Sequence, residues 1–170
     1  MENNTLALIG NTPLVHLQRV AGSCTIYAKV EKNNPSGSIK DRAALYILRD
    51  ALDKGQLRPG DTIIEATSGN MGISLALVGA ALKLHVVLVM PASMSLERRQ
   101  LMAAYGAKLE LTTEGGMQAA VQRAQHLAEE YGFFQCRQFD NPANVKAHIQ
   151  GTGAEIIRDM HMTPRAFVAG

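Results

Sequence analysis

The segment TIIEATSGNMGISLALVGAALKLHVVLVM, residues 62–90, decides the fold of this chain. Its pattern predicts a strand at 62–66, a glycine-rich turn, an almost wholly apolar helix at 73–82 and a second strand at 85–90. The second strand is continuously apolar, which is typical of a strand covered on both faces. Two strands joined by a helix form a βαβ unit, in which the strands are parallel and the crossover is right-handed.

The same alternation of strands and helices extends on both sides of this unit. Upstream, a short opening helix precedes a turn at 10–13, and a strand at 25–31 leads to a helix that ends at Gly55. Downstream, the pattern predicts a helix at about 95–105, a strand at 108–112, a helix at 117–131, a short strand at 133–136, a helix at 144–160 interrupted at Gly151-x-Gly153, and the first residues of a strand at 166–168. We therefore expect an α/β fold with helices on both faces of a parallel sheet.

Lys40 has an unusual predicted position. Ser38, followed three residues later by Asp41, has the spacing of a capping box, so we expect Ser38 to be an N-cap and Lys40 to lie in the first helical turn. The positive end of the helix dipole and the neighbouring Arg42 disfavour an ammonium there, although Asp41 partly offsets both. A lysine that readily loses its proton can attack a carbonyl carbon to form a Schiff base. On this spacing alone, a solvated lysine at a helix start is the commoner interpretation.

The segment Thr67-Ser68-Gly69-Asn70-Met71-Gly72 follows the first predicted strand and opens the next helix. Ligands of open α/β sheets bind beyond the carboxyl ends of the strands. Two glycines let the backbone approach a ligand, and the helix N–H groups with the hydroxyls of Thr67 and Ser68 suit a carboxylate or phosphate. The amide of Asn70 can donate to an oxygen of the bound molecule. The segment is neither a dinucleotide fingerprint nor a Walker loop, and an ordinary tight turn is the alternative interpretation.

Composition narrows the class of protein. Apolar residues make up 46% of the 170 and charged residues 19%, as in soluble globular domains, and the formal net charge is +2. We therefore expect no nucleic-acid partner and no membrane partner. Two cysteines without metal-like spacing favour a reduced, cytoplasmic compartment, and five scattered histidines predict no metal site.

Several ordered motifs together resemble the cysteine synthase (O-acetylserine sulfhydrylase) family of fold type II pyridoxal-phosphate (PLP) enzymes. The spacing of the motifs favours the B-type bacterial branch. The resemblance runs from Ile9 towards the end of the chain, and the lysine segment is its most specific part. The motifs are the opening signature at 9–15, the lysine segment at 29–42, the loop at 67–70, the stretches at 90–91, 94–99 and 105–107, and the stretch QFDNPAN at 138–144.

The resemblance implies a β-replacement reaction with PLP as the cofactor. It makes Lys40 the Schiff-base lysine and general base, and it gives Asn70 a contact with the phenolic oxygen of the cofactor. It assigns the substrate carboxylate to the loop residues and to a glutamine: Thr67, Ser68, Gly69, Asn70, Met71 and Gln138. The amino-acid substrate would be O-acetylserine, the product L-cysteine, and the assembly a homodimer.

Two departures from the family pattern qualify these expectations. Met71 replaces a threonine of most members, so its thioether cannot donate a hydrogen bond to the carboxylate. Plant cyanoalanine synthases resemble the chain at this position, which leaves sulfide, thiosulfate and cyanide open as nucleophiles. Family members are also much longer and continue into a phosphate-binding loop. We therefore expect residues 35–141 to form a small mobile α/β domain, and 1–34 with 142–170 an incomplete large domain that does not hold PLP tightly by itself. A catalytically inactive truncated paralogue is the alternative.

Overall fold

A computed structural model describes residues 5–18 and 24–169 of the chain. Its centre is a four-stranded sheet with the order β5-β4-β3-β6, in which every neighbouring pair is parallel. The apolar pair at the centre follows the predicted βαβ unit, with Ile64 opposite Val87. The predicted parallel sheet is thus confirmed. Its strands are β3 (Thr62–Ala66), β4 (His85–Pro91), β5 (Lys108–Thr112) and β6 (Phe134–Gln135).

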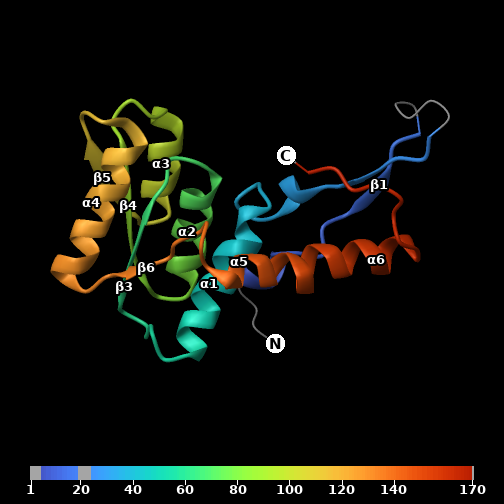
Figure 1. The fold of residues 1–170 in the computed structure, drawn as a ribbon, viewed down its shortest axis with the longest axis horizontal. Helices are drawn as coiled ribbons and strands as arrows, with labels where there is room; N and C mark the ends of the chain where they lie inside the picture. Colours follow the sequence, from blue (N-terminus) through green and yellow to red (C-terminus); the bar gives the residue numbers. More distant parts are fainter. Residues whose placement is uncertain (1–4, 19–23, 170) are drawn as a thin grey trace.

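Helices cover both faces of this sheet, as predicted (Figure 1). Side chains alternate along β3, so that Ile63 packs towards α2 whereas Ile64 packs towards α4. On the first face α2 lies so close to β4 that a Cβ atom at Gly79 would come within 2.4 Å of a methyl carbon of Val86. The helices are α1 (Lys40–Asp53), α2 (Asn70–Ala81) and α3 (Leu96–Ala104) on the first face, and α4 (Gly116–Tyr131) on the second.

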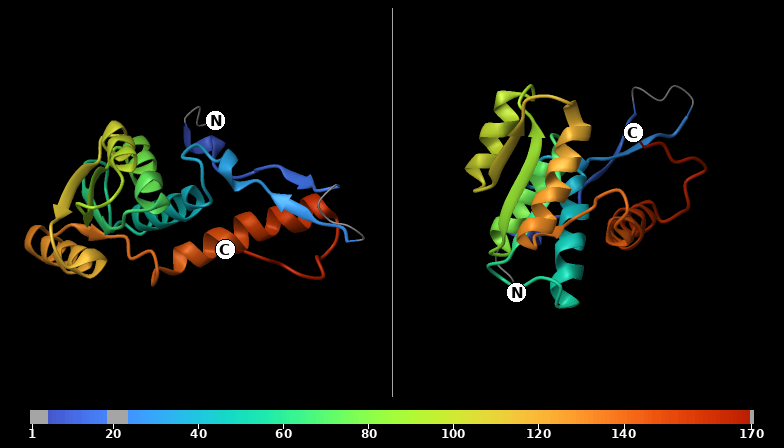
Figure 2. Two further views of the ribbon diagram at one scale, coloured as in Figure 1. Left: turned by 90° about the horizontal axis from the view of Figure 1, so that it is seen from above. Right: turned by 60° about the vertical axis from the view of Figure 1, so that its left-hand side comes forward.

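A second group of elements extends to one side of the sheet (Figures 1 and 2). It begins with the 3-10 helix η1 (Thr5–Leu8) and an antiparallel pair, β1 (Leu14–His16) with β2 (Tyr27–Lys29), followed by the 3-10 helix η2 (Glu31–Asn33). At the other end of the chain it contains α5 (Pro142–Ala147), the π-helix η3 (His148–Gly153) and α6 (Ala154–Met160). None of the helices in the described part of the chain is long and apolar enough to cross a bilayer.

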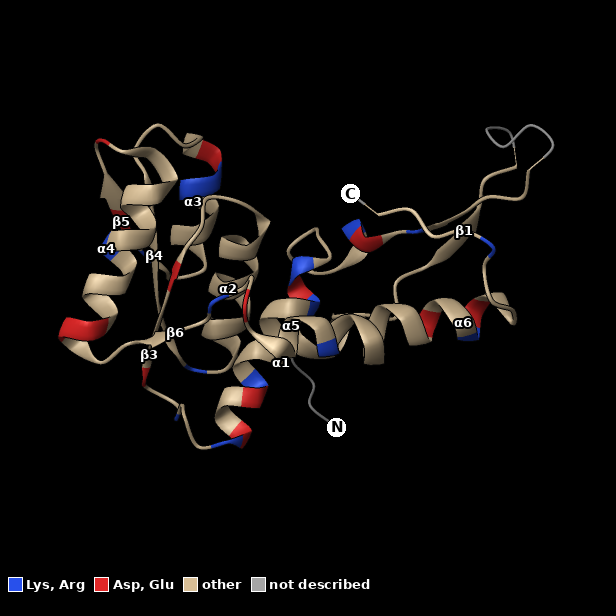
Figure 3. Cartoon of the chain, in the orientation of Figure 1, with Lys and Arg blue, Asp and Glu red and all other residues tan. Residues whose placement is uncertain are grey.

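Buried charges join this second group to α1. Arg42 donates to both carboxylate oxygens of Glu31, at 2.8 and 2.9 Å, and to both of Glu155, at 2.6 and 2.7 Å. Lys29 lies 2.8 Å from Glu155 and 3.2 Å from Asp159. We call these five residues the Arg42 ion network; Figure 3 shows its two acidic positions on α6. Because the two forks of the guanidinium hold carboxylates from distant segments, the network orients α1 relative to β2, η2 and α6.

Four local predictions are wrong or incomplete. The strand at 25–31 is limited to Tyr27–Lys29, and its partner β1 was not predicted. The helix at 144–160 continues through the glycine pair as a π-helix instead of being interrupted. Residues 166–168 form no strand, since no described strand lies beside them.

The capping box is the fourth. Ser38 Oγ does accept the N–H of Lys40 at 3.1 Å, but the helix begins at Lys40 with Ile39 as the N-cap. Asp41 does not reach back to Ser38. Its buried carboxylate accepts hydrogen bonds from Ser36 and Ser74 instead, because these donors lie beside it in the packed interface between α1 and α2.

Candidate functional site

The predicted ligand-binding segments lie at one edge of the sheet. Strands β3 and β6 are parallel neighbours, with Ile64 opposite Gln135, so their carboxyl ends point the same way. The loop 67–69 follows β3 directly, and Gln138 follows β6 by three residues. Segments 70 residues apart in sequence therefore meet beyond the strand ends, where ligands of open α/β sheets bind.

Lys40 opens α1, as predicted, and its side chain is half-buried. The positive charge of Lys40 acts on His148, the first residue of the π-helix. Burial, followed by the positive charges of Lys40 and Arg42, lowers the pKa of His148. The imidazole Nδ1 lies 3.0 Å from Thr152 Oγ1. π-helical turns are frequent at functional sites. The sequence interpretation did not single out His148, since nothing in the spacing of the scattered histidines places this one near Lys40.

The start of α1 is tied to the start of α2 by a small cluster of side chains. Asp41 Oδ2 accepts the backbone N–H of Ser36 at 2.7 Å, and Asp41 Oδ1 accepts the hydroxyl of Ser74 at 2.6 Å. The hydroxyls of Ser36 and Ser74 lie 3.0 Å apart. Ser74 stands one turn after Asn70, so this cluster holds the segment that carries Lys40 against the helix that presents Asn70.

The loop 67–69 and the first turn of α2 form an open set of donors. Thr67 is buried, and its hydroxyl accepts the N–H of Gly69 at 3.4 Å. Ser68 and Gly69 are half-buried and Asn70 is exposed. No atom lies within 4 Å of the position that a Cβ atom would take at Gly69, so a ligand can approach the backbone there. The first N–H groups of a helix have no acceptor within the helix, which makes them available to an anion.

Met71 differs from the other predicted carboxylate ligands. Its side chain is 2% exposed and belongs to the apolar cluster between the sheet and its helices. The thioether therefore faces the core, and the backbone N–H is the donor that position 71 can offer to a ligand. Gly72 lies next in the same turn, where a Cβ atom would be 2.9 Å from Met102 Cε and 3.1 Å from Thr67 Cγ2.

Gln138 is 8% exposed and is held by a carboxylate of the neighbouring strand. Its N–H donates to Glu65 Oε1 at 3.2 Å, while the N–H of Arg137 donates to Glu65 Oε2 at 2.9 Å. The sequence interpretation missed Glu65, although an acidic residue inside a short apolar strand was a visible signal. The loop after β6 is thus fastened to β3 at the point where the loop 67–69 begins.

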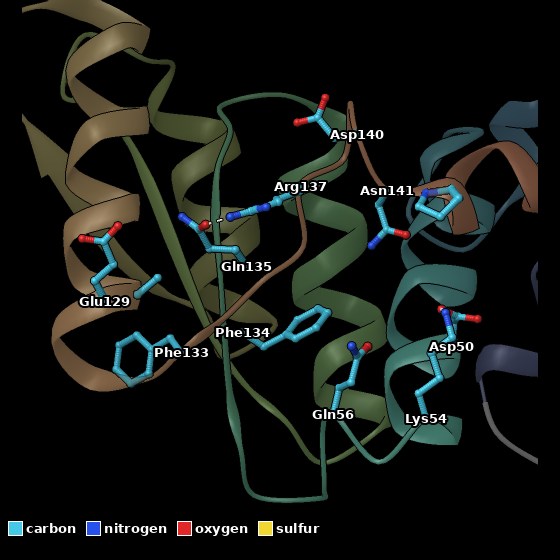
Figure 4. Close-up of a pocket in the computed structure, with 12 residues that line it drawn as sticks. Asp50, Lys54, Gln56, Glu129, Phe133, Phe134, Gln135, Arg137, Asp140 and Asn141 are labelled. Atoms are coloured by element: carbon cyan, nitrogen blue, oxygen red, sulfur yellow. Dashed lines mark hydrogen bonds and ion pairs between the residues drawn. The ribbon is translucent and has the colours of Figure 1, made fainter.

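Two cavities lie elsewhere on the described chain. One of about 570 Å³ follows the edge strand β6, and Figure 4 shows Phe133, Phe134 and Arg137 beside it. The other, of about 330 Å³, lies between α1 and the π-helix region and includes Arg42 and Glu155. Neither is lined by Lys40, the loop 67–70 or Gln138. The candidate site therefore lies outside these two cavities, at the ends of strands and the starts of helices.

These residues suit a cofactor that has a reactive carbonyl carbon and polar oxygens. The half-buried amine of Lys40, in the first turn of α1, can form a bond with such a carbonyl carbon. The exposed carboxamide of Asn70 can orient the ring that bears the carbonyl group. The open helix start and the loop hydroxyls suit the carboxylate of a small substrate. The donor set therefore fits PLP with an amino acid.

Relatives of known identity agree with this chemistry. The cysteine synthase of Flavobacterium sp. is 53% identical over 92% of this chain and 52% of its own length. The O-ureido-L-serine synthase of Streptomyces lavendulae is 52% identical over 92% of this chain and 49% of its own length. Among solved structures, O-acetyl serine sulfhydrylase isoform 3 of Entamoeba histolytica has a TM-score of 0.88 at 40% identity, over 95% of this chain and 50% of that one.

The chain spans about half the length of these relatives. The family model described as pyridoxal-phosphate dependent enzyme matches residues 5–170, nearly the whole chain. The fold, the lysine segment and the relatives agree, and the chain belongs to the family of pyridoxal-phosphate dependent enzymes.

Proposed function

We propose that the chain is the lysine-bearing half of a β-replacement enzyme that acts on an O-substituted L-serine. The finer assignment is L-cysteine formation from O-acetylserine and a sulfur nucleophile. The observation that supports it is that the 67–70 loop after β3 and Gln138 after β6 lie beyond the same edge of the sheet. Asp41, next to Lys40, is bonded to Ser74 on the helix that begins with Asn70. Relatives named cysteine synthase support the sulfur reaction, and the relative named O-ureido-L-serine synthase keeps a second nucleophile class open.

The site residues divide the tasks of this reaction. Lys40 would hold the cofactor covalently through Nζ and would later take the α-proton of the substrate at the same atom. The carboxamide of Asn70 orients the cofactor ring. PLP, when bound, draws electrons from the α-carbon so that the β-substituent can leave.

The remaining site residues bind and orient the substrate carboxylate. Thr67, Ser68 and Gly69 supply hydroxyls and backbone N–H groups at the open start of α2, and Gln138 supplies an amide from the other side. Met71 contributes only its backbone N–H, because its thioether lies in the core. A carboxylate held at two points directs the α-C–H bond towards Lys40, which is a positioning effect.

The assembly follows the same reasoning. We propose that 35–141 form the small domain and that 1–34 with 142–170 form part of a large domain, consistent with the grouping of elements around the parallel sheet. We further propose a cytoplasmic homodimer. The Arg42 ion network crosses this boundary, so α1 would be the element through which the two domains are connected.

The test supplies the half that the relatives have and this chain does not span. The chain alone, and a chimera that continues it with the second half of the Flavobacterium cysteine synthase, are mixed with PLP, O-acetylserine and sulfide, cyanide or thiosulfate. We expect Lys40-dependent product from the chimera and little from the chain alone, with Lys40→Ala as the inactive control. A folded chimera that binds PLP but forms no product would contradict the proposed function.

A further inference from the structure

Glu65 is a buried carboxylate in a strand of otherwise mainly apolar residues. It is 8% exposed, and both of its oxygens accept backbone N–H groups from the loop that follows β6. The side-chain amide of Gln138 also stabilises the charged form of Glu65. Glu65 on β3 therefore holds the backbone of Gln138 and that of the preceding Arg137.

The backbone explains why a side chain is needed here. Regular pairing of β6 with β3 ends at Gln135, after which the N–H of Cys136 still donates to the carbonyl of Ile64 at 3.3 Å. Arg137 then takes φ 49°, a left-handed conformation that is uncommon for a residue with a side chain. The N–H groups of Arg137 and Gln138 therefore donate to the Glu65 carboxylate and not to a backbone carbonyl of β3.

The far side of the loop is held by neutral groups. Asn144 Nδ2 donates to the carbonyl of Gln138 at 2.8 Å, and Asn141 Nδ2 donates to the carbonyl of Cys136 at 3.1 Å. The backbone of Gln138 is thus fastened at its N–H and at its C=O. Glu65 is the charged partner among these contacts, and hydrogen bonds to a charged group are stronger than those between neutral groups.

We propose that Glu65 is a positioning residue that sets the place and the orientation of Gln138 in the substrate-carboxylate site. This inference rests on the proposed function. The Glu65 carboxylate fixes the backbone N–H of Gln138 at the strand end, and this fixes the point from which the side-chain amide of Gln138 would donate to a substrate. Binding groups that are fixed in advance bind a ligand with less loss of conformational freedom.

The surroundings of Glu65 make the contact sensitive to pH. Burial, and to a smaller extent the negative charge of Asp140, raise its pKa, while the hydrogen bonds from the loop act in the opposite direction. The titratable group next after β6 is Cys136, whose own pKa is raised by burial and by the charge of Glu65. Opposite Glu65 on β4 stands the apolar Leu88. Protonation of Glu65 would convert one acceptor oxygen into a donor and release one N–H of the loop.

The first readout needs no catalysis. Backbone amide exchange of Arg137 and Gln138 is measured by NMR on the purified chain and on Glu65→Gln. Glu110→Gln is the matched control, since Glu110 lies on β5 and pairs with Arg123 on the surface. We expect at least one of the two amides to exchange about tenfold faster in Glu65→Gln, because the glutamine keeps a single acceptor oxygen, and both to be unchanged in the control. Their proton shifts should follow the titration of Glu65 in the wild type alone. Unchanged exchange, or identical titration in both proteins, would overturn the inference.

The second readout concerns the substrate and uses the PLP-loaded chimera with the second half of the Flavobacterium cysteine synthase. Glu65→Gln should raise KM for the amino-acid substrate about tenfold with kcat nearly unchanged, and its effect should not add to that of Gln138→Ala. Glu65→Asp keeps the charge, guards against a variant that fails to fold, and should restore part of the effect. Equal KM in Glu65→Gln and the wild type, in a protein that loads PLP on Lys40, contradicts the positioning role alone. Absence of PLP loading contradicts the proposed function instead.

Discussion

Glu155 and Glu65 are both 8% exposed, yet their surroundings act on them in opposite directions. Glu155 lies between Arg42 and Lys29, and these partners outweigh burial and lower its pKa to about 2. Glu65 accepts amide N–H groups and has no paired cation among the residues that the structure describes, so burial prevails and its pKa is raised. The same degree of burial therefore produces a firmly ionised group in one region and a titratable one in the other.

The two carboxylates have different roles in this chain: one helps to join two parts of the fold, and the other holds a loop of the candidate site. The Arg42 ion network joins the α/β part to β2, η2 and α6, and its charges are compensated. The Glu65 contact holds a loop of the candidate site, where the charge is retained at some expense of stability. Buried charges that lack a compensating partner concentrate at functional sites. The following predictions test this difference, from the largest expected effect to the smallest.

Removing Arg42 should have the largest effect on stability. Arg42→Ala removes the cation that the half-buried Glu31 and the buried Glu155 share, and leaves Glu155 with Lys29 alone. We expect the free energy of unfolding to fall by about 3–5 kcal/mol, as for other broken buried ion pairs. Urea unfolding followed by circular dichroism measures it. Arg42→Lys keeps the charge but not the double fork, so it should recover only part of the loss. A loss below that of an exposed pair would contradict the role of the network.

Lowering the pH should change the contributions of Glu155 and Glu65 to the free energy of unfolding in opposite directions. The folded-state pKa of Glu155 is about 2, below the usual 4.5, so its contribution to stability is present above about pH 4.5 and is lost as the pH falls towards 2. The folded-state pKa of Glu65 is raised, so its ionised form opposes folding at neutral pH, and that opposition is relieved as the pH falls through this value.

Unfolding free energies of the wild type, Glu155→Gln and Glu65→Gln between pH 2 and 7 measure both effects. The Glu155→Gln variant should be flatter across the acid range than the wild type, and Glu65→Gln should be the less destabilised of the two at pH 7. The opposite order at pH 7 would mean that the Glu65 contact is the stronger structural one.

An exposed ion pair supplies the smallest effect. Lys54 lies 2.5 Å from Asp50 one turn earlier on α1, and the lysine side chain is 56% exposed. Asp50→Asn should change the free energy of unfolding by less than about 0.5 kcal/mol, because solvent and salt screen such pairs. The same urea titration measures it. An effect comparable to that of Arg42→Ala would show that burial is not what distinguishes the network.

Local patterns predicted the sheet well, for a physical reason. Strands β3 and β4 are mainly apolar runs whose residues are mostly buried, so the burial of both faces follows from their own residues. The three-residue strand β1 was missed, since its extended state depends on pairing with β2 across a loop. The capping box at Ser38 was wrong for a similar reason, because the Asp41 carboxylate accepts hydrogen bonds from Ser36 and from Ser74 on α2.

The positions of the main site residues could be predicted from the sequence, but the contacts that hold them in place could not. Lys40 and Asn70 stand at helix starts that local signals place. The approach of Gln138 to Glu65 depends on the pairing of β6 with β3, and the approach of His148 to Lys40 depends on how α5 and η3 lie against α1. Neither pairing leaves a signature in the spacing of the residues. The individual roles of the site residues, apart from their places, stay predictions.

The most direct test of the central claim is covalent mapping of the lysine that PLP selects. The chimera with the second half of the Flavobacterium cysteine synthase is incubated with PLP, reduced with borohydride and digested, and the labelled peptides from residues 1–170 are quantified by mass spectrometry. The account predicts that Lys40 carries most of the label, that excess O-acetylserine reduces it, and that Lys40→Arg abolishes it. Label spread over exposed lysines such as Lys54 and Lys108, at the same level in Lys40→Arg, would contradict the account.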